Sequence, residues 1–349
     1  MLHLNGWAEA RPIVRRFAAL APLSRFDLDC RIADAFDHTS LRAALRGCEV
    51  VIHAVAGDRR TILGTLATTY NAAQEAGVRR LIYLSTASVH GQTPMPGANE
   101  DSPLNDRQCL PYNNSKVRAE WKLQKLRCRG MVEVVILRPG LVTGPRSSWI
   151  VNFADDLLAG RAYLNNRGRG ICNSIYIDNL VHAIYLSATR ACVDKQAFLV
   201  GDQETVTWSD LYRPIAGALG FDIDQVSEAI LPANPATWFD RLKKIYTSEH
   251  GQALLSVFPM RLKQAVVSAV SSYFRQSSPQ SPWTMPTPQQ PEATREMALL
   301  YQCQYKLPFE KAEKMLGYKP IVSFQEGCRR SVDWMAFAGY PVVKPEGGK

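Results

Sequence analysis

Tyr112 and Lys116 are four residues apart in the sequence PYNNSKVRAE, and a helix would place the phenol and the ammonium on one face. A nearby positive charge favours the phenolate, so we expect Lys116 to lower the pKa of Tyr112 from its ordinary value of about 10. A tyrosine tuned in this way can pass protons to and from an alcohol or a carbonyl. Ser85 and Thr86 follow an apolar run upstream, and their hydroxyls could hold the reacting oxygen. These residue types predict alcohol–ketone chemistry, although a solvated helix face also produces the Tyr-x-x-x-Lys spacing by chance.

The composition is that of an ordinary globular protein. The 349 residues are 46% hydrophobic and 21% charged, which allows one large domain or two modest ones. The net charge of +9 suits anionic partners such as phosphorylated cofactors, nucleotide-linked substrates or an acidic membrane surface. No nucleic-acid recognition motif accompanies this charge, so we predict a small-molecule substrate and no nucleic acid.

Eight cysteines are scattered along the chain, and none has the C-x-x-C spacing of a zinc site. No metal site is therefore predicted. No apolar run reaches the length of a membrane span, and Met1 to Trp7 is too short and polar for a signal peptide. Free thiols in a reducing compartment follow, which predicts a cytoplasmic protein. His53, His90 and His182 lack partners at ligand spacing, and we interpret them as structural.

The chain alternates short apolar runs with helical patterns, which is typical of β-α units around a parallel sheet. Strands are predicted at residues 12–14, 28–33, 50–55, 81–84, 132–137, 174–177 and 198–200. Helices are predicted at residues 40–46, 61–76, 112–127 and 178–188, and a last one ends near residue 220. The caps expected for the first and last of these helices are Thr39 or Ser40, and Thr207 or Ser209.

A change of character divides the second half of the chain. Residues 238–274 form a basic amphipathic stretch, which either packs on the domain or makes peripheral membrane contact. Residues 277–291 are rich in Pro, Ser and Gln and are predicted to be an exposed linker. Packed structure resumes at residues 309–334. We predict an NAD(P)-binding domain at 1–150 and a mixed region at 151–349 that holds the remaining sheet elements, a substrate domain and the insert at 238–291.

In this order, the elements resemble the extended short-chain dehydrogenase/reductase superfamily, also called the NAD-dependent epimerase/dehydratase family. The resemblance covers residues 12–220 and resumes at 309–334. Its motifs are Ile32 to Asp37, Val51 to Ala56, Gly64-Thr65, Ala76 to Val78, Leu84 to Gly91, Tyr112 with Lys116, Leu137 to Pro145, and Tyr176 to Asn179. No single motif is decisive, but their shared order is typical of the family. The resemblance implies an α/β fold, a Rossmann-like doubly wound parallel sheet with a small mixed C-terminal substrate domain.

The resemblance also implies roles for individual residues. Thr86 would donate a hydrogen bond to the substrate oxygen, Tyr112 would be the general acid/base, and Lys116 would hydrogen-bond the nicotinamide ribose. Arg15, with Arg16 beside it, favours NADP over NAD, because Arg accommodates a 2′-phosphate. The implied cofactor-binding residues are Arg15, Asp34, Ala35, Ala54, Val55, Ala56, Ser85, Tyr112, Lys116 and Pro139.

One departure from the family concerns phosphate binding. The family opens with a strand, a Gly-x-x-Gly-x-x-Gly turn and a helix whose N-terminus holds the pyrophosphate. Met1 to Gly6 reads like the last turn of that helix, so the strand and the glycine turn are missing. We expect the chain to begin inside a longer gene product rather than to be a truncated form. As it stands we expect it to bind cofactor weakly, and NADPH binding in the micromolar range or tighter would contradict this.

The resulting prediction is an NAD(P)-dependent oxidoreductase or epimerase that acts on a hydroxyl or keto group of a sugar-like substrate, including a nucleotide sugar. A 4,6-dehydratase is disfavoured because no Asp-Glu pair follows Thr86. One alternative is a 3β-hydroxysteroid-dehydrogenase-like enzyme acting on a lipid-like alcohol, supported by the apolar residues from Val257 to Phe274. Another is a non-catalytic protein with a degraded cofactor site. The sequence indicates no oligomer interface, and the resemblance allows a homodimer, since related enzymes are often dimers.

Overall fold

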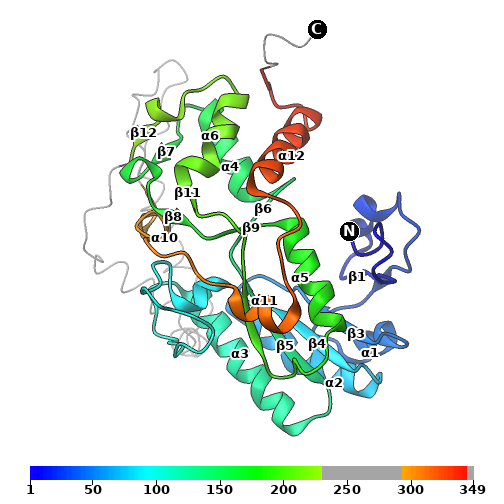
Figure 1. Cartoon of the computed structure of the whole chain (residues 1–349). Coiled ribbons are helices and arrows are strands. Elements are labelled where there is room, and N and C mark those ends of the chain that lie inside the picture. The colour runs from blue at the N-terminus through cyan, green and yellow to red at the C-terminus, as the bar shows by residue number, and fades with distance from the viewer. Residues whose placement is uncertain (230–292, 344–349) are drawn as a thin grey trace, which may run out of the picture. The chain divides into compact units, whose positions relative to one another are not determined.

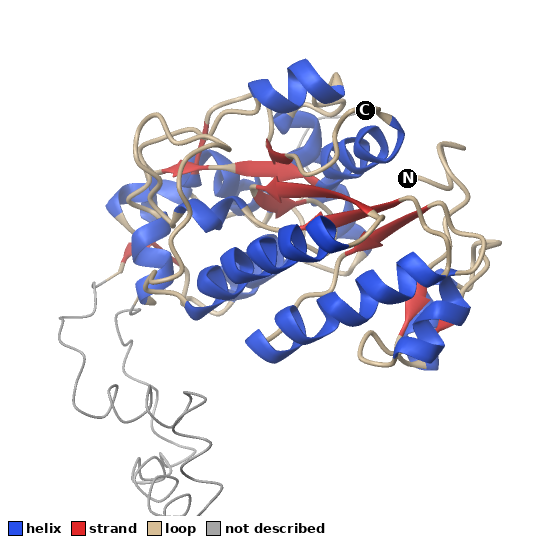
Figure 2. Cartoon of the chain, turned by 90° about the horizontal axis from the view of Figure 1, so that it is seen from below, coloured by secondary structure: helices blue, strands red, loops and turns tan. Residues whose placement is uncertain are grey.

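In the computed structural model, four parallel strands form the central sheet in the order β10-β5-β4-β3 (Figure 2). They are β3 (Val50–His53), β4 (Arg80–Leu84), β5 (Glu133–Pro139) and β10 (Ala197–Val200). Their sequences are rich in Val, Ile and Leu, as is usual for strands covered on both faces. The α/β fold with a parallel sheet is therefore confirmed.

The structure describes residues 1–229 and 293–343, which belong to one compact unit. The predicted amphipathic stretch at 238–274 and the predicted linker at 277–291 lie outside the described residues. Within the described ranges, no helix is long and apolar enough to cross a membrane. The division into two domains near residue 150 stays a prediction.

Shorter strands form separate pairs outside the central sheet. β1 (Ile13–Val14) runs parallel to β2 (Arg31–Ile32), and β6 (Leu141–Thr143) runs parallel to β9 (Ser174–Tyr176). β7 (Tyr163–Leu164) pairs with β12 (Ser227–Glu228), and β8 (Ile171–Cys172) pairs with β11 (Val206–Thr207). β6 directly follows β5 in the chain and leads toward the helical region described below.

Helices cover both faces of the central sheet. One face packs against α1 (His38–Leu45), α2 (Arg59–Glu75) and α3 (Pro111–Arg129), and α2 and α3 lie side by side (Figures 1 and 2). The other face packs against α5 (Ile177–Thr189) and α11 (Glu310–Leu316). Along β4, Tyr83 points to the first of these faces and Ile82 to the second, as the alternation of a strand requires.

A second helical cluster surrounds Trp208, in the upper part of Figure 1. It consists of α4 (Ser148–Leu158), α6 (Trp208–Ala218), α10 (Arg295–Leu300) and α12 (Phe324–Phe337). The rings of Phe153 and Tyr212 stack with their centroids 3.8 Å apart, which fixes α4 against α6. The short 3-10 helices are η1 (Phe17–Leu23), η2 (Ala87–His90), η3 (Asn166–Gly168) and η4 (Ile223–Gln225).

Of the two helix caps predicted from the sequence, that of α6 is confirmed and that of α1 is wrong. Thr207 caps α6 and forms a capping box with Asp210, as predicted. The predicted caps of α1 are wrong, because α1 begins at His38 and its cap is Asp37. The Asp37 carboxylate accepts from the backbone N–H of Thr39 and Ser40, so those residues lie inside the first turn.

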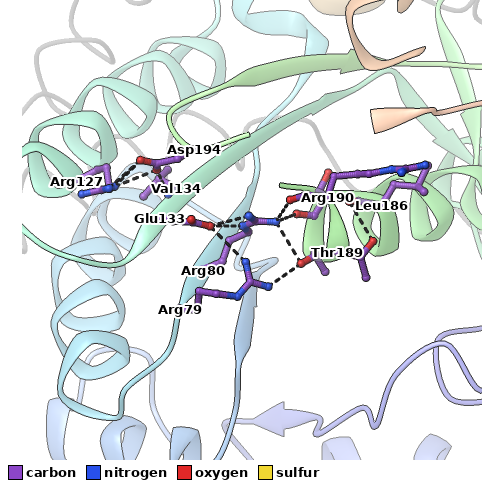
Figure 3. A network of polar contacts seen from close by, with 11 residues as sticks. Arg79, Arg80, Arg127, Glu133, Val134, Leu186, Thr189, Arg190 and Asp194 are labelled. Atoms are coloured by element: carbon purple, nitrogen blue, oxygen red, sulfur yellow. Dashed lines mark hydrogen bonds and ion pairs between the residues drawn. The ribbon is translucent and has the colours of Figure 1, made fainter. Parts of the chain in front are cut away.

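Arg80, at the start of β4, is 1% exposed and lies at the C-terminal end of α5 (Figure 3). Its guanidinium donates to the carbonyls of Ser187 (2.6 Å) and Arg190 (2.7 Å) and pairs with Glu133 on β5 (2.6 Å). The last carbonyls of a helix have no partners within the helix, and Arg80 supplies two of the missing donors. Arg80 thereby joins the central sheet to α5 at the start of β4, the opposite end of that strand from the candidate site.

Candidate active site

Helix α3 carries the predicted acid/base pair. Pro111 occupies its first turn, where the missing backbone N–H costs nothing, and the helix runs from there to Arg129. Tyr112 and Lys116 lie one turn apart, and Lys116 Nζ is 5.9 Å from the centroid of the Tyr112 ring. The structure therefore brings the two side chains together on one helix face.

Lys116 is buried beneath the end of β4, with 3% of its surface exposed. Its Nζ donates to the carbonyl of Leu84 (2.8 Å) and lies 4.9 Å from the centroid of the Tyr83 ring. Burial lowers the pKa of Lys116 to about 8, against the opposing influence of Glu120 one turn further along α3. The ammonium therefore loses its charge more readily than a surface lysine.

The expected lowering of the Tyr112 pKa is wrong for this structure. Tyr112 is only partly buried, but the partial desolvation raises its pKa, and the negative charge of Glu296 raises it further. The reason lies in the direction of Lys116, whose Nζ bonds to the Leu84 carbonyl, while no hydrogen bond from it to the phenol oxygen is present among the described residues. The phenol of Tyr112 is consequently protonated at neutral pH.

Ser85 and Thr86 follow β4 and differ in what their hydroxyls do. Ser85 is 5% exposed and donates its hydroxyl proton to Glu120 Oε1, so this proton is not available to a substrate. Thr86 caps η2, and its Oγ1 accepts from the backbone N–H of Ser88 (3.2 Å). A hydroxyl that accepts one bond still has its proton to donate. Thr86 thus caps η2 after the end of β4 and remains able to hold a substrate oxygen.

A buried ion pair supports this corner of the site. Arg138 at the end of β5 donates to Glu120 through Nη2 (2.8 Å) and Nε (3.2 Å), and their side chains are 5% and 4% exposed. Arg138 Nη1 also donates to the carbonyl of Glu100 (3.0 Å) and lies 3.2 Å from His90 Nε2. Burial and the Arg138 charge lower the pKa of His90 to about 4, which agrees with a structural role for this histidine. The pair links α3 to β5 behind Ser85.

Ser85, Thr86, Tyr112 and Pro139 line one pocket of about 460 Å³. The pocket extends from the carboxyl ends of β4 and β5 to the second helical cluster. Further lining residues are Gln92, Trp149, Asn173, Trp208, Glu296 and Leu307. Tyr112 is 43% exposed and forms part of the pocket wall, so its phenol faces a space that a small molecule can enter.

The other predicted cofactor residues lie outside this pocket and follow strands β3, β2 and β1. Ala54, Val55 and Ala56 follow β3, whose His53 pairs in register with Tyr83 of β4, so they share an edge with Ser85 and Thr86. Asp34 and Ala35 follow β2, where Asp34 Oδ1 accepts from the backbone N–H of Phe36 (2.9 Å). Arg15 follows β1 and is exposed.

All eight cysteines are free, which confirms the prediction of unpaired thiols. Cys172 and Cys303 contribute to the pocket wall, and burial raises the pKa of the thiol in each. Such thiols stay protonated at neutral pH and are poor nucleophiles. They therefore act as apolar lining.

Comparison with known proteins identifies the family. Residues 9–201 match the model of the NAD dependent epimerase/dehydratase family. The chain belongs to this family. The resemblance carried by the sequence motifs is thereby confirmed, and the chain is an enzyme of an NAD-dependent epimerase, dehydratase and reductase family.

Relatives of this chain are named for different activities. The 3beta-hydroxysteroid-dehydrogenase/decarboxylase isoform 1 of Arabidopsis thaliana is 24% identical over 86% of this chain, which spans 65% of that relative's length. The 2-alkyl-3-oxoalkanoate reductase of Shewanella oneidensis is 23% identical over 85% of this chain and 73% of its own. A crystal structure of UDP-glucuronic acid 4-epimerase from Bacillus cereus, with UDP-glucuronic acid and NAD, has a TM-score of 0.66 and 15% identity, covering 97% of this chain and 94% of that chain. This last likeness shows the fold.

The residues at the strand ends fit the nicotinamide cofactor of the family. Lys116 has three N–H donors, and Leu84 is its one hydrogen-bond acceptor among the described residues. A buried ammonium with unused donors suits the hydroxyls of a ribose. On and after β2, in the separate β1–β2 pair, Ile32 is 52% and Phe36 is 44% exposed, and these apolar side chains suit the face of a base.

Sequence reasoning missed several residues of the site. The ion pair of Glu120 with Arg138 had one available signal, since Glu120 follows Lys116 at the same four-residue spacing that links Lys116 to Tyr112. Gln92 and Glu296 had none, because they are 204 residues apart in the chain and meet only in the folded protein.

Proposed function

We propose that this chain catalyses the NAD(P)-dependent interconversion of a hydroxyl and a keto group on a small molecule bound in the pocket. The observation that carries the proposal is that Thr86 and Tyr112 line one pocket, with Lys116 one helical turn behind Tyr112. Carbonyl reduction requires a proton donor, a hydrogen-bond donor to the carbonyl oxygen and a nearby cation. Tyr112, Thr86 and Lys116 provide these three groups.

The reaction assigns one task to each residue. A nicotinamide cofactor, when bound, would supply or accept the hydride. Tyr112 holds its proton at neutral pH because its pKa is raised, so it acts first as the acid that protonates the carbonyl oxygen during reduction. Thr86 donates a hydrogen bond to that oxygen and holds it near the phenol. In the reverse direction Tyr112 must first lose its proton, so alcohol oxidation is expected to accelerate as the pH rises.

The substrate class follows from the pocket more than from the fold. The sequence favours a sugar-like substrate, and the structural neighbour holds UDP-glucuronic acid. The second candidate, a lipid-like alcohol, is supported by the apolar lining residues Leu141, Val142, Ile171, Leu300 and Leu307. The names of the two curated relatives, a hydroxysteroid dehydrogenase and an oxoalkanoate reductase, point the same way. Both candidates share the alcohol–ketone step at Tyr112.

Replacement of Tyr112 by Phe tests the proposal. The purified chain is offered nucleotide sugars, sterols and their keto forms with NADH and NADPH, and turnover is followed by nicotinamide absorbance. Loss of the phenol proton is expected to lower kcat by about 10²- to 10⁴-fold for the substrate that is turned over. Tyr185→Phe is the matched control, because Tyr185 lies on α5 and stacks on Trp7, away from the pocket lining.

Two results would contradict the proposal. One is a Tyr112→Phe variant that is as active as the parent chain. The other is a folded parent chain that binds NADH or NADPH but turns over no member of the panel, which would favour the non-catalytic alternative. Circular dichroism spectra of both variants check that a loss of turnover is not a loss of fold.

A further inference from the structure

Glu296 is the only charged side chain among the described residues that line the pocket. It lies on α10, far along the chain from Tyr112, and no lysine or arginine accompanies it in that lining. A pocket for a diphosphate normally offers arginine, lysine or a helix N-terminus to the phosphate oxygens. The described lining of this pocket instead offers the carboxylate of Glu296.

A hydrogen bond holds Glu296 in place. Gln92 Nε2 donates to Glu296 Oε1 (3.1 Å), and Gln92 is only 8% exposed. This bond fixes the orientation of the Gln92 amide, because the opposite orientation would bring two acceptors together. The Gln92 carbonyl oxygen is buried without a partner, which shows that the amide is oriented toward the carboxylate at some cost.

The second carboxylate oxygen of Glu296 has no donor within the part of the chain that the structure describes. Glu296 is exposed and lines the pocket, and its charge raises the pKa of Tyr112. An ionised carboxylate accepts hydrogen bonds and cannot donate them. It therefore attracts a hydroxyl group and repels a phosphate.

We propose that Glu296 determines specificity at this site. Its second carboxylate oxygen, which has no donor among the described residues, accepts a hydrogen bond from a second hydroxyl of the substrate, next to the reacting carbon, and its charge excludes anionic substrates such as nucleoside diphosphate sugars. The inference rests on the proposed function for the identity of the reacting group. The substrate class is an uncharged hydroxylated ring compound, whose apolar parts contact Trp149, Trp208 and Leu307.

Equilibrium binding of three probes tests this inference without turnover. The probes are cis-cyclohexane-1,2-diol, cyclohexanol and UDP-glucose, titrated into the full chain and followed by ligand-observed NMR. A hydrogen bond to a charged group predicts that the diol binds about tenfold or more tightly than cyclohexanol. Glu296→Ala should abolish this difference. Glu296→Gln, which keeps an acceptor oxygen and loses the charge, should strengthen UDP-glucose binding by about tenfold, the effect of removing one nearby like charge.

Glu313→Gln is the matched control, since Glu313 is an exposed carboxylate on α11 outside the pocket. It should leave all three affinities unchanged. Equal binding of the diol and cyclohexanol, binding of neither, or UDP-glucose binding that Glu296→Gln does not improve would each overturn the inference. The proposed function fails separately, through an active Tyr112→Phe variant, because these binding measurements do not depend on proton transfer.

Discussion

Replacing Glu120 by Gln removes one charge from a pair that is almost completely buried. Glu120 and Arg138 are 4% and 5% exposed, and the carboxylate accepts three hydrogen bonds from two nitrogens of the guanidinium and one from Ser85. The Glu120→Gln substitution would keep the size of the side chain and part of its hydrogen bonding. It would leave the Arg138 charge without its counter-ion in a site where water cannot replace the carboxylate.

The expected cost follows from that burial. Breaking a buried pair by removing one partner costs about 3 to 5 kcal/mol of unfolding free energy. The new amide still accepts a hydrogen bond, so the lower end of the range, about 3 kcal/mol, applies to Glu120→Gln. Asp224→Asn supplies the control, because the Arg213–Asp224 pair is 52% and 71% exposed. Exposed pairs contribute about 1 kcal/mol or less.

Urea denaturation followed by circular dichroism measures both variants, because urea does not screen charges as a guanidinium salt does. The double variant Glu120→Met with Arg138→Leu separates a buried charge from a lost contact, and it should be more stable than Glu120→Gln. A Glu120→Gln variant that loses no more stability than Asp224→Asn would refute the reasoning. So would a double variant less stable than the single one.

Three further predictions concern the site itself. Burial lowers the pKa of Lys116 to about 8 in the native state from 10.5, so the unfolded chain binds more protons between these values and stability rises with pH across that window. Lys116→Met should remove this rise, which denaturation midpoints on either side of the window measure. Thr86→Val should lower kcat by about 10²- to 10³-fold, since it removes a donor to the reacting oxygen, and should cost about 1 kcal/mol of stability, since it also removes the cap of η2; unchanged kcat would leave Thr86 as a cap alone. Arg15→Ala should weaken NADPH binding about tenfold and leave NADH binding unchanged; equal effects in calorimetric titrations would contradict the preference for NADP.

The central sheet could be predicted from the sequence because strands covered on both faces read as continuous apolar runs. This holds for β4 and β5, where the predicted and observed strands agree within one or two residues. Strand β2 was expected over six residues and forms only at Arg31–Ile32, since its pairing is limited to the equally short β1. Asp37 was missed as a cap because Thr39 and Ser40, two good capping residues, follow it directly.

The candidate site could be predicted where its residues share one local element. Tyr112 and Lys116 share a helix, so their spacing predicts the one face on which the structure holds them. Their catalytic roles and that of Thr86, which follows β4, depend on the family resemblance and stay predictions. The pKa of Tyr112 could not be predicted, because a charge four residues away is visible in a sequence while burial and the direction of a side chain are not. Glu296 enters the site from a distant helix, and no local pattern indicates which strand end it faces.

The spacing along α3 has a consequence for how this segment can vary. Tyr112, Lys116 and Glu120 follow one another at intervals of one turn, and each meets a different partner: the pocket, the Leu84 carbonyl and Arg138. One inserted residue between them would rotate everything behind it by about 100° around the helix axis. The exposed side chains of α3 can vary over generations, but the residue count from Tyr112 to Glu120 cannot. Insertions and deletions should accumulate in the loop before Pro111 instead.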